Sequence, residues 1–230
     1  MKILDTLQKR KLKQSQVSKE LKITVAEASR HLERLSEDKL IRKQPSGQYE
    51  LTPFGSLIWT LLPSLAFASK HRDYFMEYDA FRIPLEFIAR MGELRKGESM
   101  PNTLRNLEQE ENEIREAHQF VWILSDQILT STVSPLAEKV KGPFELRIIL
   151  PEGGFPPESV SRLPSRIPSI QKRVLPKIDA LVVLTEKYAV FCLPNRSGNI
   201  DYTGFAGKDP EFHKWCKDLY LHYWEKAKPL

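Results

Sequence analysis

The sequence of 230 residues is poor in cysteine and has no long apolar run. Its two thiols, Cys192 and Cys216, cannot build a disulfide framework, and the absence of a Cys-x-x-Cys pair argues against structural zinc. The longest apolar stretch, residues 56–68, is interrupted by Pro63 and is shorter than the roughly 20 residues that span a bilayer. No N-terminal signal pattern is present. We therefore expect a cytoplasmic protein without a membrane partner.

Motifs of catalysis are also missing. The chain contains no GxGxxG, Walker loop, GxSxG or HExxH, and its five histidines are dispersed, so neither a metal nor a cofactor is expected. The His-x-Lys motif of phospholipase D phosphodiesterases is absent, because His213 is followed directly by Lys214. These absences predict that the protein is not an enzyme. A phosphodiesterase or nuclease is the least favoured alternative.

Positive charge is concentrated at the start of the chain. Residues 1–52 hold 12 of the 35 Lys and Arg but only 7 of the 30 Asp and Glu, a net charge of +5. The remaining 178 residues hold 23 of each and are neutral. Phosphate backbones favour such a local excess through counterion release, so double-stranded DNA is the expected partner.

Residues 1–52 also show the pattern of three helices followed by a hairpin. Helices are expected at 2–9 and 16–21, the second capped by Ser15, and a third begins after Thr24, which forms a capping box with Glu27. Two short strands, 40–44 and 48–51, flank a Pro-Ser-Gly turn. This order is that of a winged helix-turn-helix.

The third helix and the hairpin supply the candidate DNA contacts. Small and basic side chains at the start of the second helix of a helix-turn-helix suit the major groove, and polar side chains at a hairpin tip suit phosphates. The candidates are Thr24, Ala26, Glu27, Ser29, Arg30, His31, Arg34, Lys43, Gln44, Ser46 and Gln48. Two alternatives remain open: Arg30 and Arg34 pair with acidic neighbours on a solvated face, or the domain binds protein rather than DNA.

A connecting helix is expected over 53–80. Thr52 is a good N-cap, Pro53 suits the first helical position, and helical composition continues to about Tyr78 with a kink at Pro63. Its apolar stripe consists of Phe54, Leu57, Ile58, Leu61, Leu62 and Leu65. Such a stripe needs a cover, which we expect to be both the second domain and a second subunit, making the protein a homodimer.

Residues 81–230 show an α/β pattern. Helices are expected around 84–91, from about residue 104, over 126–140, and from Asp209-Pro210 onward. Strands are expected at 120–124, 144–150, 178–185 and 188–193, with a Pro-rich loop over 151–168. The first strand, helix and second strand form a βαβ unit, which implies parallel pairing.

Two groups of residues in this α/β region are candidates for sensing. Trp122, Arg147, Tyr188 and Phe191 are candidates for a pocket that binds an anionic effector, although core packing and one strand-borne arginine explain them more simply. Cys192 and Cys216 are expected to be small core residues. A redox-switched regulator that uses both thiols is the alternative.

Several segments carry a resemblance to a known family. The run ITVAEASRHLERLSEDKLIRK…GQYELTPFG resembles the start of many archaeal winged-helix transcriptional regulators. The segments YFMEYDAFRIPLEFIARMGEL and WCKDLYLHYWEKAKPL resemble the subgroup that carries the methanogenesis-regulator (filamentation response) middle domain at the C-terminus. The resemblance implies a cytoplasmic archaeal regulator whose α/β domain is related to inactive phospholipase D-like folds. Matched by position, its recognition helix carries Thr24, Glu27, Ser29, Arg30, His31 and Arg34. Lys39 departs from the pattern, since such sequences usually have Gly there.

The sequence thus predicts three parts: a winged helix-turn-helix DNA-binding domain over 1–52, a connecting or dimerisation helix over 53–80, and an α/β effector-sensing or interaction domain over 81–230. The predicted function is that of a dimeric transcriptional regulator. Its partners would be DNA, a second copy of the chain, and a small-molecule or protein effector.

Overall fold

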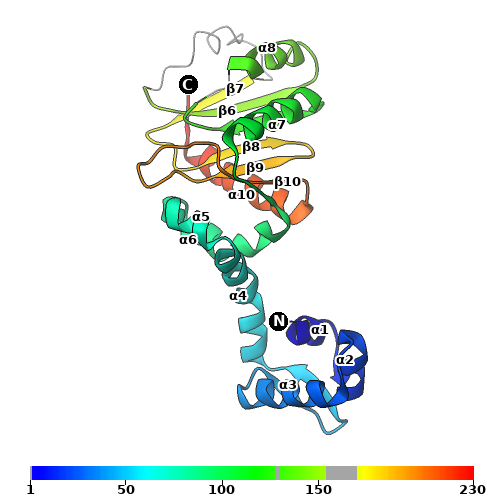
Figure 1. The fold of residues 1–230 in the computed structure, drawn as a ribbon. Helices are drawn as coiled ribbons and strands as arrows, with labels where there is room; N and C mark the ends of the chain where they lie inside the picture. Colours follow the sequence, from blue (N-terminus) through cyan, green and yellow to red (C-terminus); the bar gives the residue numbers. More distant parts are fainter. Residues whose placement is uncertain (1, 128–129, 154–169) are drawn as a thin grey trace. The chain divides into compact units, whose positions relative to one another are not determined.

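The computed structural model describes residues 2–127, 130–153 and 170–230 (Figure 1). The chain divides into an N-terminal unit, Met1–Ala66, and a C-terminal unit, Phe67–Leu230. The boundary falls inside helix α4 (Pro53–Lys70). The segment 53–80, expected to be a separate connection, is therefore divided between the two units.

The N-terminal unit contains the expected helices and hairpin, with one additional strand. The sheet has the strand order β1-β3-β2 and is antiparallel throughout. The hairpin turns at Gly47, whose φ of +79° is a conformation that glycine adopts without strain. Its elements are α1 (Lys2–Lys9), β1 (Leu12–Lys13), α2 (Gln14–Leu21), α3 (Val25–Glu37), β2 (Ile41–Lys43), β3 (Gln48–Leu51) and the start of α4.

A single apolar cluster holds these elements together. Each helix contributes side chains from the face that its 3–4 residue periodicity places inside, and Trp59 and Leu62 of α4 pack against the cluster. The buried members are Ile3, Leu4, Leu7, Leu12, Val17, Leu32 and Ile41. The periodicity of α1 and α3 predicted this face correctly.

The start of α2 differs from the expectation. The helix begins at Gln14 rather than Gln16, and Ser15 lies in its first turn instead of capping it. The Gln16 side chain accepts the Lys13 N–H at 2.8 Å, which satisfies a donor at the helix start. Lys13 is extended because it belongs to β1, a two-residue strand too short to leave an alternating pattern in the sequence.

The turn after α3 places Lys39 in the left-handed region, with φ +59°. The N–H groups of Lys39 and Leu40 donate to the carbonyls of Ser36 and Leu35 at 3.0 and 2.9 Å, which closes the end of the helix. The Thr52 hydroxyl donates to the Lys39 carbonyl at 2.6 Å. The turn therefore has the geometry that favours glycine, although lysine occupies it.

Helix α4 begins as expected and ends earlier. Thr52 Oγ1 accepts the Gly55 N–H at 2.9 Å, and Gly55 is required because a Cβ there would lie 1.8 Å from the Leu40 carbonyl oxygen. The helix passes Pro63 but stops at Lys70 rather than continuing to Tyr78. His71 leaves helical geometry where its ring packs against Phe205, with the centroids 4.8 Å apart.

The C-terminal unit is built on one eight-stranded mixed sheet with the order β11-β7-β6-β5-β8-β9-β10-β4 (Figure 1). Strands β5, β6 and β7 are parallel, which confirms the βαβ pairing, and all other pairings are antiparallel. The strands are β4 (Glu98–Met100), β5 (Phe120–Leu124), β6 (Glu145–Pro151), β7 (Ile170–Leu175), β8 (Leu181–Thr185), β9 (Ala189–Cys192), β10 (Gly204–Gly207) and β11 (Lys228–Pro229).

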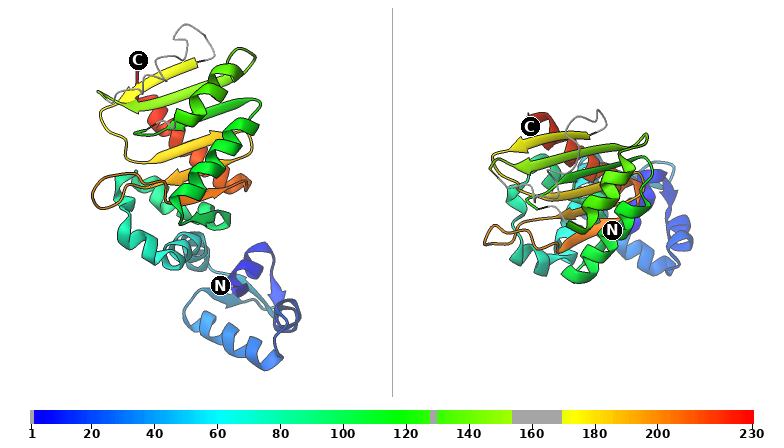
Figure 2. Two further views of the ribbon diagram at one scale, coloured as in Figure 1. Left: turned by 45° about the horizontal axis from the view of Figure 1, so that its top comes forward. Right: turned by 90° about the horizontal axis from the view of Figure 1, so that it is seen from above.

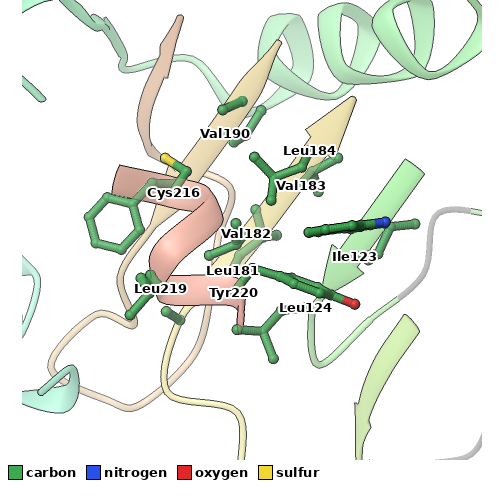
Figure 3. Packing of buried hydrophobic residues seen from close by; sticks show 14 of the residues in the cluster. Ile123, Leu124, Leu181, Val182, Val183, Leu184, Val190, Cys216, Leu219 and Tyr220 are labelled. Carbon is green, nitrogen blue, oxygen red and sulfur yellow. The ribbon is translucent and has the colours of Figure 1, made fainter. Parts of the chain in front are cut away.

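Helices cover both faces of this sheet. Helices α7 and α8 lie on one face and α10 on the other (Figure 2). All five residues of β8 are buried between the layers, together with Leu219 and Tyr220 of α10 (Figure 3). The described helices of this unit are α5 (Arg72–Glu77), α6 (Leu85–Ala89), α7 (Thr103–Glu116), α8 (Thr130–Lys139) and α10 (Pro210–Lys226), with 3-10 turns η1 (Ala80–Arg82) and η2 (Met91–Lys96).

Four strands of this unit were not expected from the sequence. Strands β4, β10 and β11 are short, and β7 carries Gln171, Lys172 and Arg173 in its centre, so none forms an apolar run. The Pro-rich loop predicted over 151–168 lies largely outside the described residues. Within the described ranges, no helix is long and apolar enough to cross a membrane.

Glu110 is an exception to the apolar packing beneath α7. It is buried on the sheet-facing side of the helix, and its Oε2 has no hydrogen-bond partner among the described residues. Burial raises the pKa of this carboxyl to about 8, so the folded protein holds it in the neutral form at pH 7.

We expect the C-terminal unit to lose stability as the pH rises from about 4.5 to about 8. The folded state keeps the Glu110 proton over this window, whereas the unfolded chain, with the ordinary pKa of 4.5, has lost it. In Glu110→Gln, which mimics the neutral acid, this decline should disappear. Urea titrations at several pH values measure it, with the exposed Glu108→Gln on the same helix as control. An unchanged pH profile in Glu110→Gln would contradict the assignment.

Replacing Lys39 by glycine should stabilise the N-terminal unit by about 1 kcal/mol, because a left-handed residue with a Cβ is strained. The neighbouring Asp38, with φ −70°, provides the matched control. Asp38→Gly should instead destabilise the unit. Hydrogen exchange of the α3 amides reports both changes, and a loss of protection in Lys39→Gly would show that the lysine itself is needed.

Candidate nucleic-acid interface

Helix α3 exposes small and basic side chains to solvent, together with Glu33 and Glu37. Its buried side holds Ala28 and Leu32, while the opposite side exposes the sequence-predicted residues Ala26, Ser29, Arg30, His31 and Arg34. The helix begins at Val25, so the exposed residues occupy its first three turns. The structure therefore brings these five candidates onto one accessible surface, as the periodicity indicates.

Thr24 and Glu27 form the predicted capping box. The Glu27 N–H donates to Thr24 Oγ1 at 3.2 Å, and Glu27 Oε2 accepts from both the N–H and the hydroxyl of Thr24 at 2.8 Å. These bonds to the Thr24 backbone and hydroxyl lower the pKa of Glu27 and keep it charged. Both side chains are thus engaged in fixing the start of α3, which orients the residues that follow them.

Arg30 and Arg34 do not form the alternative ion pairs considered from the sequence. The ion pairs within the described part of this unit join Lys9 to Asp5, Arg10 to Glu20, and both Lys11 and Arg42 to Glu50. Neither arginine of α3 takes part in one. Their guanidinium groups are exposed and available to an external anion.

The hairpin supplies fewer free groups than the sequence suggested. Lys43 is exposed, with its Nζ 5.8 Å from the centroid of the Tyr49 ring. Ser46 at the tip donates to Gln48 Oε1 at 3.2 Å, and Gln44 donates its side-chain amide to Glu50. Lys43 is therefore the hairpin cation that forms no ion pair within the described residues. Gln44 and Gln48 are half-buried.

Glu50 ties the three strands of this sheet together, a role that the sequence analysis missed. Its carboxylate lies 2.6 Å from both Lys11 Nζ, just before β1, and Arg42 Nε on β2. The hydrogen bonds from Lys11 and then Arg42 lower the pKa of Glu50 to about 2. Arg42 and Glu50 are direct cross-strand partners, so the register of the hairpin was the signal that could have identified them.

The four residues expected to line one effector pocket are not brought together. Arg147 lies across from Trp122 in the register of β5 and β6, with its guanidinium carbon 4.5 Å from the Trp122 ring centroid. Phe191 is fully buried against Trp215, whereas Tyr188 precedes β9 and is almost fully buried. Trp122 and Phe191 both contact α10, through Tyr220 and Trp215, but β8 lies between their strands, so the four side chains do not line one pocket.

Both cysteines are fully buried. Burial raises the pKa of the Cys192 and Cys216 thiols above the ordinary value, so each is held as a neutral thiol. This environment matches the expected core role and disfavours the redox switch, which needs an accessible thiolate. In the described ranges, no group of three or more His, Cys, Asp and Glu side chains is placed to hold a metal ion.

No known family model matches the chain, and no curated protein matches it. Among solved structures, one similar chain is TrmBL2, an archaeal chromatin protein with a novel mode of DNA binding, at 14% identity over 99% of this chain and 92% of that one, with a TM-score of 0.49. Another is NucT from Helicobacter pylori, at 14% identity over 59% of this chain and 98% of that one, with a TM-score of 0.46. Both scores lie below 0.5, so a functional assignment depends on the chain's own residues.

Proposed function

We propose that this protein is a transcriptional regulator whose residues 1–52 form a winged helix-turn-helix that binds double-stranded DNA. The observation that carries the proposal is the face of α3, where Arg30, His31 and Arg34 are exposed beside small side chains. Lys43 on the hairpin adds a further cation. Exposed arginines beside small side chains on a helix suit the major groove, and a hairpin lysine suits the phosphates.

The sequence resemblance extends the proposal to the family and the cell compartment. We assign the chain to the archaeal regulators with the methanogenesis-regulator middle domain, acting in the cytoplasm. In this proposal the C-terminal unit has an inactive phospholipase D-like fold and senses a ligand or docks a partner instead of catalysing a reaction. The missing His-x-Lys motif supports this role. Phosphodiesterase turnover that a single substitution in the C-terminal unit abolishes would overturn it.

Arg30→Ala should weaken binding to a preferred duplex by about 1–3 kcal/mol and relax base preference, because a guanidinium reads guanine edges in the major groove. Lys43→Ala should weaken binding to all sequences alike and reduce the salt slope by about one unit. Fluorescence anisotropy with labelled duplexes at several salt concentrations measures both effects. The exposed Lys141→Ala in the C-terminal unit is the control. Parent-like binding by both variants would show that DNA binds elsewhere or not at all.

We further propose that the protein is a homodimer in which α4 contributes to the subunit contact. Trp59 and Leu62 face the core of the N-terminal unit, but four large apolar side chains of the same helix remain in solvent. Phe54, Leu57, Leu61 and Leu65 are 49%, 56%, 51% and 68% exposed. Their spacing places them on one stripe of the helix. In a dimer, two winged helix-turn-helix domains match the two half-sites of a DNA site.

Charged residues on this stripe should dissociate the dimer. We expect Leu57→Asp combined with Leu61→Asp to raise the dimer dissociation constant by more than about tenfold, because each leucine loses its apolar burial in both subunits. Sedimentation equilibrium measures the constant, with Thr60→Asp, exposed on the same helix, as control. A monomeric parent at micromolar concentration excludes the dimer, and a dimer that the double variant leaves intact excludes this interface.

A further inference from the structure

A cleft of about 690 Å³ lies where the β8–β9 turn, the start of β5 and the first turns of α10 meet. Four of its lining side chains are lysines, Lys187, Lys208, Lys214 and Lys217, and His213 lines it as well. We call it the basic cleft. Its charge is unexpected because residues 53–230 have no net charge. These cations come from three separate segments of the chain, so only the fold gathers them.

Two of these lysines are free to bind an anion. Lys208 is paired with Glu113 at 2.8 Å and Lys214 with Asp218 at 2.6 Å. Lys187 and Lys217 form no ion pair with any residue that the structure describes. Lys187 is exposed, and Lys217 lies with its Nζ 5.3 Å from the centroid of the Trp122 ring.

The carboxylate that lines the basic cleft, Glu186, is held by the backbone through one oxygen, while its Oε2 is buried without a hydrogen-bond partner among the described residues. Its Oε1 accepts the His118 N–H at 2.8 Å. Burial disfavours its charge, but the backbone N–H groups of His118, Gln119 and Phe120 outweigh burial and lower the pKa of Glu186. Glu186 thus hydrogen-bonds to the start of β5 and forms no ion pair with Lys187 or Lys217 in the described structure.

The walls of the basic cleft are fixed by the core. His213 Nε2 donates to the carbonyl oxygen of Thr185 at 2.7 Å, and Thr185 is buried at the end of β8. Asp209 caps α10 by accepting the Glu211 N–H at 3.0 Å. The half-buried ring of Phe120 lines the same cleft and contacts Trp122, with the ring centroids 5.0 Å apart. The cleft is thus preformed, with cations and an aromatic surface together.

We propose that the basic cleft binds a small phosphorylated ligand of the nucleotide class. Lysine ammonium groups bind phosphate oxygens through charge-assisted hydrogen bonds, and an aromatic ring stacks on a base. The volume lies within the range of small-molecule sites. As the effector of a regulator, this ligand rests on the proposed function. The binding itself is a property of the C-terminal unit.

Calorimetry on the full-length protein without DNA tests the proposal with ADP, pyrophosphate and adenosine. ADP should bind with a dissociation constant below about 1 mM, pyrophosphate more weakly, and adenosine without measurable heat. Lys187→Gln combined with Lys217→Gln should weaken ADP binding by about tenfold or more, since each lysine loses a charged hydrogen bond. The control is Lys226→Gln, which removes an exposed lysine from the far end of the same helix. It should leave ADP binding unchanged.

Three results would overturn the inference. The first is no ADP binding below about 1 mM. The second is parent-like ADP binding by the double variant at an unchanged thermal midpoint. The third is equal affinity for pyrophosphate and ADP, which would remove the base-stacking role of Phe120. Arg30→Ala separates this inference from the proposed function, because it should impair DNA binding while leaving ADP binding intact.

Discussion

Burial of both faces of strand β8 is the constraint on which the C-terminal unit depends. Each of its five residues is enclosed between the helix layers, so the strand can exist only inside a sheet covered on both sides. The side chains in the described core of this unit are mostly apolar, with the buried carboxyl of Glu110 on α7 among the few that are not. Polar groups therefore gather at its margins, and the basic cleft lies at one of them, where Thr185 ends the strand and anchors His213.

In the N-terminal unit, burial of Ala28 and Leu32 decides which face of α3 points outward, and hydrogen bonds fix where its elements begin and pair. The Thr24–Glu27 capping box fixes the start of α3, and Glu50 joins the strands of the small sheet. Glu50 is paired with Lys11 and Arg42, whereas Glu27 is held by hydrogen bonds from Thr24. Arg30 and Arg34 have no ion-pair partner in the described part of the chain, so their guanidinium groups remain available on the exposed side of α3.

The two proposed binding surfaces use the same chemistry in different ways. On α3, the planar guanidinium groups of Arg30 and Arg34, beside small residues, suit base edges and the phosphates of a long duplex. In the basic cleft, lysines beside Phe120 suit the compact charge of one small phosphorylated molecule. A ligand that favours the DNA-binding state must, by thermodynamic linkage, bind more tightly when DNA is present.

The sequence by itself determined the elements with strong local signals. The capping box, the Gly47 turn, the stripes of α1 and α3 and the apolar runs of β5 and β8 follow from spacing and residue type alone. Only the tertiary structure decided what depends on distant segments: the polar strand β7, the separation of Tyr188 and Phe191 from Trp122 and Arg147, and the basic cleft. The reason is physical, because pairing and burial join residues far apart in the chain, and local periodicity carries no information about which segments meet.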